Sequence, residues 1–192
     1  MTVGYVVLAA GRGRRFGGQK LRAELHGRSL ISRALDAVPA GAPACVVAGE
    51  PEIMAMARAR GMAAVCNTCP AEGISRSIRL GIEALPEADA LCFLVADQPL
   101  LSRRSVAHLA DVWAQMPEKI VRAAHGATPG NPCIFPRRFF AELLTLREDR
   151  GGSAVIRAHP ESVQCVQLPA HELLDCDTPE ALALLSGKEE AQ

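Results

Sequence analysis

The sequence predicts an α/β protein in which a mostly parallel, mixed sheet forms the middle of three layers, with helices on both faces. Three observations lead to this fold class. Short apolar segments alternate with amphipathic ones along the chain. Several apolar segments are nearly unbroken and rich in valine, which is typical of strands buried on both faces. Finally, 49% of the 192 residues are hydrophobic, enough for a large core.

The elements follow one another in a regular order. Apolar runs predict strands at residues 3–8, 44–48, 62–66, 90–96, 120–124, 133–135 and 163–168. Helical spacing of apolar residues predicts helices at 28–38, 51–60, 75–85, 102–116, 136–146, 153–159 and 179–185. Because no linker, repeat or low-complexity tract divides the chain, we expect one domain over residues 1–186 and a polar C-terminal tail over 187–192.

Composition excludes several classes of partner. The 21 basic and 21 acidic residues give a formal charge of zero, so no overall field attracts nucleic acid or an anionic membrane. No apolar run approaches the ~20 residues of a membrane span, and the N-terminus lacks a signal-peptide pattern, which predicts a cytoplasmic protein.

The seven cysteines are expected to be reduced core thiols. Cys66 and Cys69 form a C-x-x-C pair, but no second pair completes a zinc site.

A glycine-rich loop follows the first strand, and its composition is suited to a triphosphate. Its glycines and basic residues are Gly11, Gly13, Gly17, Gly18, Arg12, Arg14, Arg15 and Lys20. Glycines free the backbone to turn N–H groups towards an anion. A dinucleotide fingerprint is excluded because Phe16 takes the third glycine position, and a P-loop because Leu21 follows Lys20. The alternative is a turn with solvated arginines.

Other candidate residues also follow strands, where ligands of such folds bind. Asp97 follows the strand at 90–96 and suits Mg²⁺, and the alternative is a helix cap or a turn. Asp175 and Asp177 precede the last helix, where capping is again the alternative. The loop at 67–77 offers an anion site or a plain helix cap. The segment at 126–132 is expected to be a tight loop, with or without a ligand.

Together these segments resemble the molybdenum-cofactor nucleotidyltransferases of the glycosyltransferase-A-like fold, and within them the CTP:molybdopterin cytidylyltransferase branch. The resemblance rests on five motifs: Leu8-Ala9-Ala10-Gly11-x-Gly13-x-Arg15-Phe16-Gly17-Gly18-x-Lys20, Glu72-Gly73-x-Ser75-x-Ser77, Asp97-Gln98-Pro99, Gly130-Asn131-Pro132 and Asp177-Thr178-Pro179. They span nearly the whole chain. One departure is Gln19, where relatives often have an acidic residue.

The resemblance implies transfer of CMP from CTP to the terminal phosphate of molybdopterin, with release of pyrophosphate. It implies Mg²⁺ as cofactor, held by Asp97 and Asp177, and a catalytic set of Arg15, Lys20 and Asp97. The implied nucleotide-binding residues are Leu8, Ala9, Ala10, Gly11, Gly13, Arg15, Lys20 and Ser77. On the acceptor side it implies Arg76, Gly130 and Asn131. A client molybdoenzyme or its chaperone is a further implied partner.

Three other functions stay open from the sequence. The guanylyl branch uses GTP, and its members typically read Leu-Ala-Gly-Gly where this chain has Leu8-Ala9-Ala10-Gly11. A cytidylyltransferase acting on a sugar or polyol phosphate would share the glycine loop and the strand-end aspartate. A non-catalytic chaperone could bind and deliver finished cofactor, although the presence of Arg15, Lys20, Asp97 and Asp177 favours an enzyme.

Overall fold

The computed structural model describes residues 1–11, 16 and 19–189, and in this part of the chain the main sheet has seven strands. Its spatial order is β5-β4-β1-β6-β8-β7-β9. The strands are β1 (Val3–Ala9), β4 (Ala44–Ala48), β5 (Ala63–Cys66), β6 (Ala90–Val95), β7 (Ile120–His125), β8 (Thr128–Pro136) and β9 (Val163–Gln167). Strand β8 alone runs against its neighbours β6 and β7, which confirms a mostly parallel, mixed sheet.

Helices cover both faces of this sheet, as predicted. They are α1 (Leu30–Asp36), α2 (Pro51–Ala59), α3 (Ile74–Ala84), α4 (Arg103–Gln115), α5 (Phe140–Thr145), α6 (Ser153–Ala158) and α7 (Pro179–Glu189). Apolar residues of α1, α2 and α4 join one core cluster, and those of α3, α5 and α6 join the other. Strand β1 separates the two clusters, with Val7 packed in the first and Val6 in the second, both fully buried.

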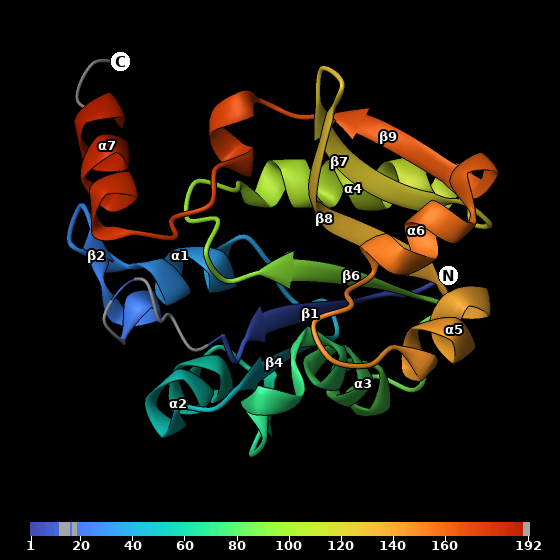
Figure 1. The fold of residues 1–192 in the computed structure, drawn as a ribbon, viewed down its shortest axis with the longest axis horizontal. Helices are drawn as coiled ribbons and strands as arrows, with labels where there is room; N and C mark the ends of the chain where they lie inside the picture. Colours follow the sequence, from blue (N-terminus) through green and yellow to red (C-terminus); the bar gives the residue numbers. More distant parts are fainter. Residues whose placement is uncertain (12–15, 17–18, 190–192) are drawn as a thin grey trace.

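A third, small apolar cluster lies at one end of the molecule. There α7 packs against the short hairpin of β2 (Glu24–Leu25) and β3 (Arg28–Ser29), while α5 and α6 lie at the opposite end (Figure 1). Leu25, Leu30, Cys176 and Leu185 are its buried members. This hairpin was not predicted, because two-residue strands are too short to give a periodic pattern.

The structure corrects the prediction of a loop at 126–132. The turn is confined to Gly126 and Ala127, and β8 already begins at Thr128. Prolines suggested a loop, but β8 pairs with β6 only from Cys133 onward, so Pro129 and Pro132 lie where the strand has a single neighbour. A strand tolerates proline there, because on its unpaired side no neighbouring strand would accept the backbone hydrogen bond that proline cannot donate.

Two boundaries and one class of side chain also differ from expectation. The helix expected at 136–146 divides into a 3₁₀ turn (Arg137–Phe139) and α5, and α7 continues to Glu189, past the tail boundary at 187. All seven cysteines are free thiols, but Cys66, Cys69 and Cys165 are exposed instead of in the core. None of the helices in the described part of the chain combines the length and apolar character needed to cross a membrane.

Gly81 allows the close approach of α3 to β1 and gives a test of this packing. A Cβ atom at position 81 would lie 2.5 Å from Val6 Cγ1 and 3.1 Å from Val6 Cγ2. Overpacking costs about 1–3 kcal/mol, against a gain of about 1 kcal/mol in helix propensity. We expect Gly81→Ala to lower the free energy of unfolding by about 1 kcal/mol in urea titrations. The control is Gly49→Ala, whose added Cβ meets nothing closer than Asn67 O at 3.7 Å; an equal loss there would contradict the packing argument.

Candidate active site

A pocket of about 510 Å³ opens at the carboxyl edge of the sheet, where the sequence placed the site. Its wall includes Leu8, Ala10 and Gly11 at and after the end of β1. Val95 and Asp97, at the end of β6, form the adjoining part of the wall. Because β1 and β6 are parallel and pair at Leu8 and Val95, their carboxyl ends lie side by side. The two candidate segments therefore face one space.

The ammonium group of a partly buried lysine lies between two carboxylates in this pocket. Lys20 Nζ donates to Asp97 Oδ2 at 2.8 Å and to Asp177 Oδ1 at 2.6 Å. The side chain of Lys20 is only 10% exposed, whereas those of Asp97 and Asp177 are 28% and 50% exposed. Lys20 thus contacts two carboxylates that lie 77 and 157 positions after it in the sequence.

Local structure explains how these three side chains meet. Lys20 begins a 3₁₀ turn (Lys20–Arg22) that is anchored by the buried side chain of Leu21. On the other side, the backbone N–H of Cys176 donates to the carbonyl of Asp97 at 2.8 Å. Since Cys176 is fully buried in the small cluster under α7, this bond fixes the segment that carries Asp177.

The charges of the site shift the pKa values of its groups. Burial lowers the pKa of Lys20, but the hydrogen bonds to Asp177 and Asp97 raise it, and the net result is a pKa above the ordinary 10.5. Burial and the neighbouring charge of Asp97 raise the pKa of Asp175. Lys20 is therefore a cation at neutral pH and compensates part of the negative charge of the three carboxylates.

Asn67 lies at another part of the pocket wall and was not among the predicted residues. It follows β5, is 2% exposed, and its side chain joins three other groups. Nδ2 donates to Ser77 Oγ at 3.1 Å, while Oδ1 accepts from Arg76 Nε at 3.1 Å and from the Cys69 backbone N–H at 3.0 Å. The rule that ligands bind where strands end could have found Asn67.

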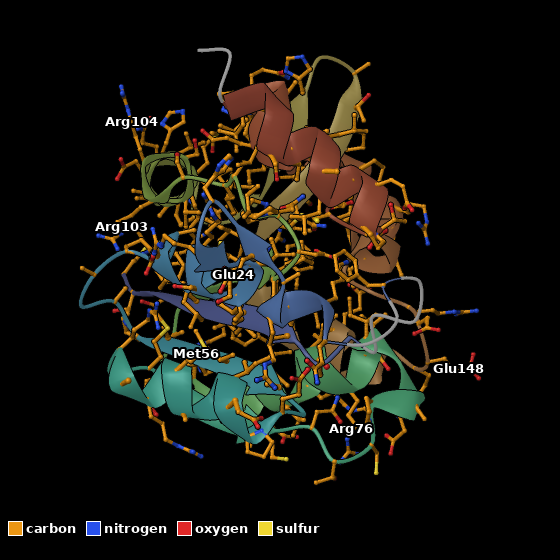
Figure 2. The ribbon with its side chains drawn as sticks, turned by 90° about the vertical axis from the view of Figure 1, so that its left-hand side faces the viewer. Glu24, Met56, Arg76, Arg103, Arg104 and Glu148 are labelled. Atoms are coloured by element: carbon orange, nitrogen blue, oxygen red, sulfur yellow. The ribbon has the colours of Figure 1, made fainter. Side chains whose placement is uncertain are left out.

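The loop before α6 closes the same wall. The N–H of Ser75 donates to the Glu148 carbonyl at 3.1 Å, and Asp149 lines the pocket. At Gly73, which has φ +82°, a Cβ would lie 2.2 Å from the Glu148 carbonyl carbon, so only glycine allows this approach. Figure 2 labels Arg76 and Glu148, which lie on the side of the molecule where the start of α3 meets the loop before α6.

Comparison with known proteins identifies the family. The sequence profile of the MobA-like NTP transferase domain matches residues 5–163. The chain belongs to this family. It is therefore a nucleotidyltransferase, and the predicted resemblance is confirmed at the level of the family. A comparison with curated protein sequences gives no match.

Solved structures show the same fold for this MobA-like NTP transferase. Rv0371c from Mycobacterium tuberculosis H37Rv is 24% identical, with a TM-score of 0.81 over 97% of this chain and 98% of that one. The same protein was solved in complex with manganese. Mth528, a nucleotidyl transferase from Methanothermobacter, is 20% identical, with a TM-score of 0.83 over 100% and 99%. CMP:2-keto-3-deoxy-manno-octonic acid synthetase complexed with CTP is 13% identical, with a TM-score of 0.78 over 100% and 99%.

The structure brings most of the predicted site residues together. One pocket is lined by Leu8, Ala10, Gly11, Lys20, Ser77, Asp97 and Asp177. The side chain of Ala9 instead points into the core, so that only its backbone is close to this space. Gly13 and Arg15 lie outside the described residues. In the described part of the chain, the glycine loop therefore lines the pocket with residues of its two ends, Ala10 and Gly11 at the first and Lys20 at the last.

The predicted acceptor residues are placed less uniformly. Asn131 lines a smaller, mainly apolar pocket of about 110 Å³ that shares Leu8 and Val95 with the large one. Gly130 lines neither pocket; its carbonyl accepts a hydrogen bond from Arg122 Nε at 3.1 Å. The guanidinium of Arg76 is outside both walls as well, because Nη1 donates to both carboxylate oxygens of Glu72.

The ion pairs of Lys20 predict a pH-dependent contribution to stability in metal-free protein. A raised folded-state pKa gives stabilisation that is complete below the unfolded-state value near 10.5 and is lost as pH rises through the folded-state value. We expect Lys20→Met to lower the free energy of unfolding by about 1–2 kcal/mol between pH 7 and 9, reduced by the exposure of Asp177. The difference in the free energy of unfolding between wild type and Lys20→Met should shrink above pH 10.5.

The measurement is urea unfolding of both proteins in chelator-treated buffer at several pH values. Lys119→Met is the control, because Lys119 is half-buried and donates to a backbone carbonyl, that of Glu161, instead of to a carboxylate. A gap that stays constant or widens above pH 10.5 would show that the ammonium group is not what stabilises this end of the fold.

Proposed function

We propose that this MobA-like NTP transferase moves CMP from CTP to the terminal phosphate of molybdenum-bearing molybdopterin, forming molybdopterin cytosine dinucleotide and pyrophosphate. The observation that carries the proposal is the position of the Lys20 ammonium between Asp97 and Asp177, in a pocket that begins directly after β1. A cation and two carboxylates at one point suit a reaction between phosphates that uses a divalent metal. The motifs of the cytidylyl branch support the choice of substrates.

The donor set of the pocket fits a magnesium ion. Mg²⁺ is commonly held by one or two carboxylates together with substrate phosphates and water. Asp97 and Asp177 offer two such carboxylates, and both are already within 2.8 Å of one cationic centre, the Lys20 ammonium. In the proposed complex these two residues would hold Mg²⁺, which supplies charge stabilisation to the phosphates when bound. The manganese complex of Rv0371c is consistent with a divalent cation in this fold.

The chain's own residues supply position and charge. A phosphate oxygen of the acceptor attacks the α-phosphorus in line, the bond to the β-phosphate oxygen breaks, and pyrophosphate leaves with the bonding electrons. Lys20 lies where it can turn from the carboxylates to the triphosphate and neutralise the charge that grows on the leaving group. Arg15 is assigned the same task. No residue need act as a strong base, because the attacking phosphate is already an anion.

The base is proposed to lie against Ala10 and the wall formed by the end of β5 and the start of α3. Ala10 lines the pocket at the end of β1. Its methyl group takes space that the second ring of a purine would need, which favours CTP over GTP. The complex of CMP:2-keto-3-deoxy-manno-octonic acid synthetase with CTP is an example of a similar fold that binds this nucleotide.

The experiment that tests the proposal is an assay of pyrophosphate release with each nucleoside triphosphate and each class of acceptor. CTP with molybdopterin should be turned over. Product analysis should show molybdopterin cytosine dinucleotide. Turnover of GTP equal to that of CTP would replace the proposal with the guanylyl function, and turnover of sugar or polyol phosphates alone would replace molybdopterin as acceptor. Binding without turnover would indicate a chaperone.

Asp97→Asn should abolish most activity while leaving the fold intact. The amide keeps the shape of the side chain but loses the charge that holds the metal, and we expect kcat to fall by about a hundred- to a thousandfold, equivalent to about 3–4 kcal/mol. Binding of Mn²⁺, followed by electron paramagnetic resonance, should weaken in parallel. Asp89→Asn is the matched control, because Asp89 lies at the opposite end of the same strand, where it accepts from the Thr2 N–H. Near-normal turnover at saturating Mg²⁺ would remove Asp97 from the metal site.

Ala10→Gly should relax the choice of base. A methyl-sized space is worth about 1–3 kcal/mol, so we expect wild type to prefer CTP over GTP by roughly ten- to two-hundredfold from this contact. In Ala10→Gly the ratio of kcat/KM for the two nucleotides should fall without inverting. Ala9→Gly is the control, since the Ala9 side chain faces the core and its loss should reduce stability but keep the ratio. An unchanged ratio in Ala10→Gly would place the base elsewhere.

A further inference from the structure

The hydrogen bonds of Asn67 fix which way its amide group points. Two groups reach its Oδ1, the Cys69 backbone N–H at 3.0 Å and Arg76 Nε at 3.1 Å, and each of them can only donate. The amide oxygen must therefore face these two groups. Its Nδ2 then faces Ser77 and donates to Oγ at 3.1 Å. Because Asn67 is 2% exposed, water does not compete for this arrangement.

This orientation decides what the Ser77 hydroxyl can do. A serine hydroxyl has one proton to donate and two lone pairs that accept. Since Oγ accepts from Asn67, the proton remains for another partner, and no other hydrogen bond of this hydroxyl is found in the described part of the chain. Ser77 is 5% exposed and lines the large pocket. The pocket therefore presents a hydrogen-bond donor at this position.

The donor lies on the part of the wall assigned to the base. Asn67 follows β5 and Asp97 follows β6, and the order β5-β4-β1-β6 separates these strands by three spacings, about 14 Å. The phosphates are assigned to Asp97 and Lys20. A nucleotide bound with its phosphates there extends its nucleoside towards Asn67 and Ser77.

We infer that Asn67 is a positioning residue that makes Ser77 a hydrogen-bond donor to the N3 atom of the pyrimidine, and so selects cytosine over uracil. Cytosine N3 carries a lone pair and accepts a hydrogen bond. Uracil N3 carries a proton, so two donors would face each other and the buried hydroxyl would lose its partner. This inference rests on the proposed nucleotide site and adds a basis for discrimination that Ala10 does not give, because the two pyrimidines have the same size.

Asn67→Asp replaces the hydrogen-bond donor that faces Ser77 with an acceptor and changes the shape of the side chain little. One carboxylate oxygen still accepts from Arg76 and Cys69. The other replaces Nδ2 and can only accept, so it takes the proton of Ser77. Ser77 then presents lone pairs to the pocket and favours the N3–H of uracil.

The experiment measures binding of CTP and UTP to the full chain with Mg²⁺ by calorimetry, for wild type, Asn67→Asp, Ser77→Ala and the double variant. We expect wild type to bind CTP at least tenfold more tightly than UTP, and each variant to bring the ratio within about threefold of unity. The double variant should differ little from Ser77→Ala alone. Both nucleotides carry the same triphosphate, so the added charge beside Arg76 cancels in the ratio.

Ser75→Ala is the matched control, because Ser75 is a fully buried serine of the same helix whose hydroxyl donates to the Glu72 carbonyl, outside the pocket. The ratio of CTP to UTP affinity in Ser75→Ala should equal that of wild type. If Asn67→Asp does not fold, Asn67→Ala removes the same donor and should lower the ratio as well.

Three results would overturn the inference. The first is a wild type that binds CTP and UTP equally. The second is an Asn67→Asp variant that weakens both nucleotides and keeps their ratio. The third is a Ser77→Ala variant that changes the ratio of CTP to dCTP instead, which would place the hydroxyl against the ribose. None of these depends on the acceptor, so a failure to transfer CMP to molybdopterin would refute the proposed function and leave this test intact.

Discussion

The site depends on the contact of one ammonium group with two carboxylates. Asp97 and Asp177 come from the end of β6 and from the segment before α7, and without a cation between them their charges would repel. Lys20 supplies that cation from the third segment, the end of the glycine loop. The backbone hydrogen bond from the Cys176 N–H to the Asp97 carbonyl also ties together the two segments that carry the carboxylates, independently of this cation. In the proposed reaction the same cation would also meet the triphosphate.

Apolar packing makes this arrangement possible at the edge of the protein. The small cluster of Leu25, Leu30, Cys176 and Leu185 holds α7 against the hairpin, and Phe16 of the glycine loop packs against it. The loop that carries Lys20 and the segment that carries Asp177 therefore share one hydrophobic support. The two large clusters of the main sheet contain none of these five residues, but Leu21, next to Lys20, belongs to the first of them and ties the turn of Lys20 to the main core as well.

Sequence reasoning succeeded where one physical signal dominates and failed where two compete. The strand at 44–48 was predicted to the residue because it is buried on both faces, and Asp97 was found because strand ends bind ligands. The resemblance implied Arg76 as an acceptor contact, and the sequence did not show that Glu72, four residues earlier, pairs with it. Asn67 was overlooked, because it lies inside the C-x-x-C pair of Cys66 and Cys69 and in none of the five motifs. Its orientation depends on hydrogen bonds to residues 69, 76 and 77, which no local pattern reveals.

The antiparallel direction of β8 makes the proposed acceptor side differ from the proposed nucleotide side. In a parallel sheet each carboxyl end continues into a loop, which is how β1, β5 and β6 bring Gly11, Asn67 and Asp97 to the pocket. Because β8 runs the other way, its beginning lies at this edge. Asn131 reaches the smaller pocket from an irregular part of this strand, between the pair Arg122–Cys133 and the pair Ala124–Pro129 with β7. The proposed nucleotide site is thus lined by loops that follow parallel strands, and the proposed acceptor residue Asn131 comes from the irregular beginning of an antiparallel one.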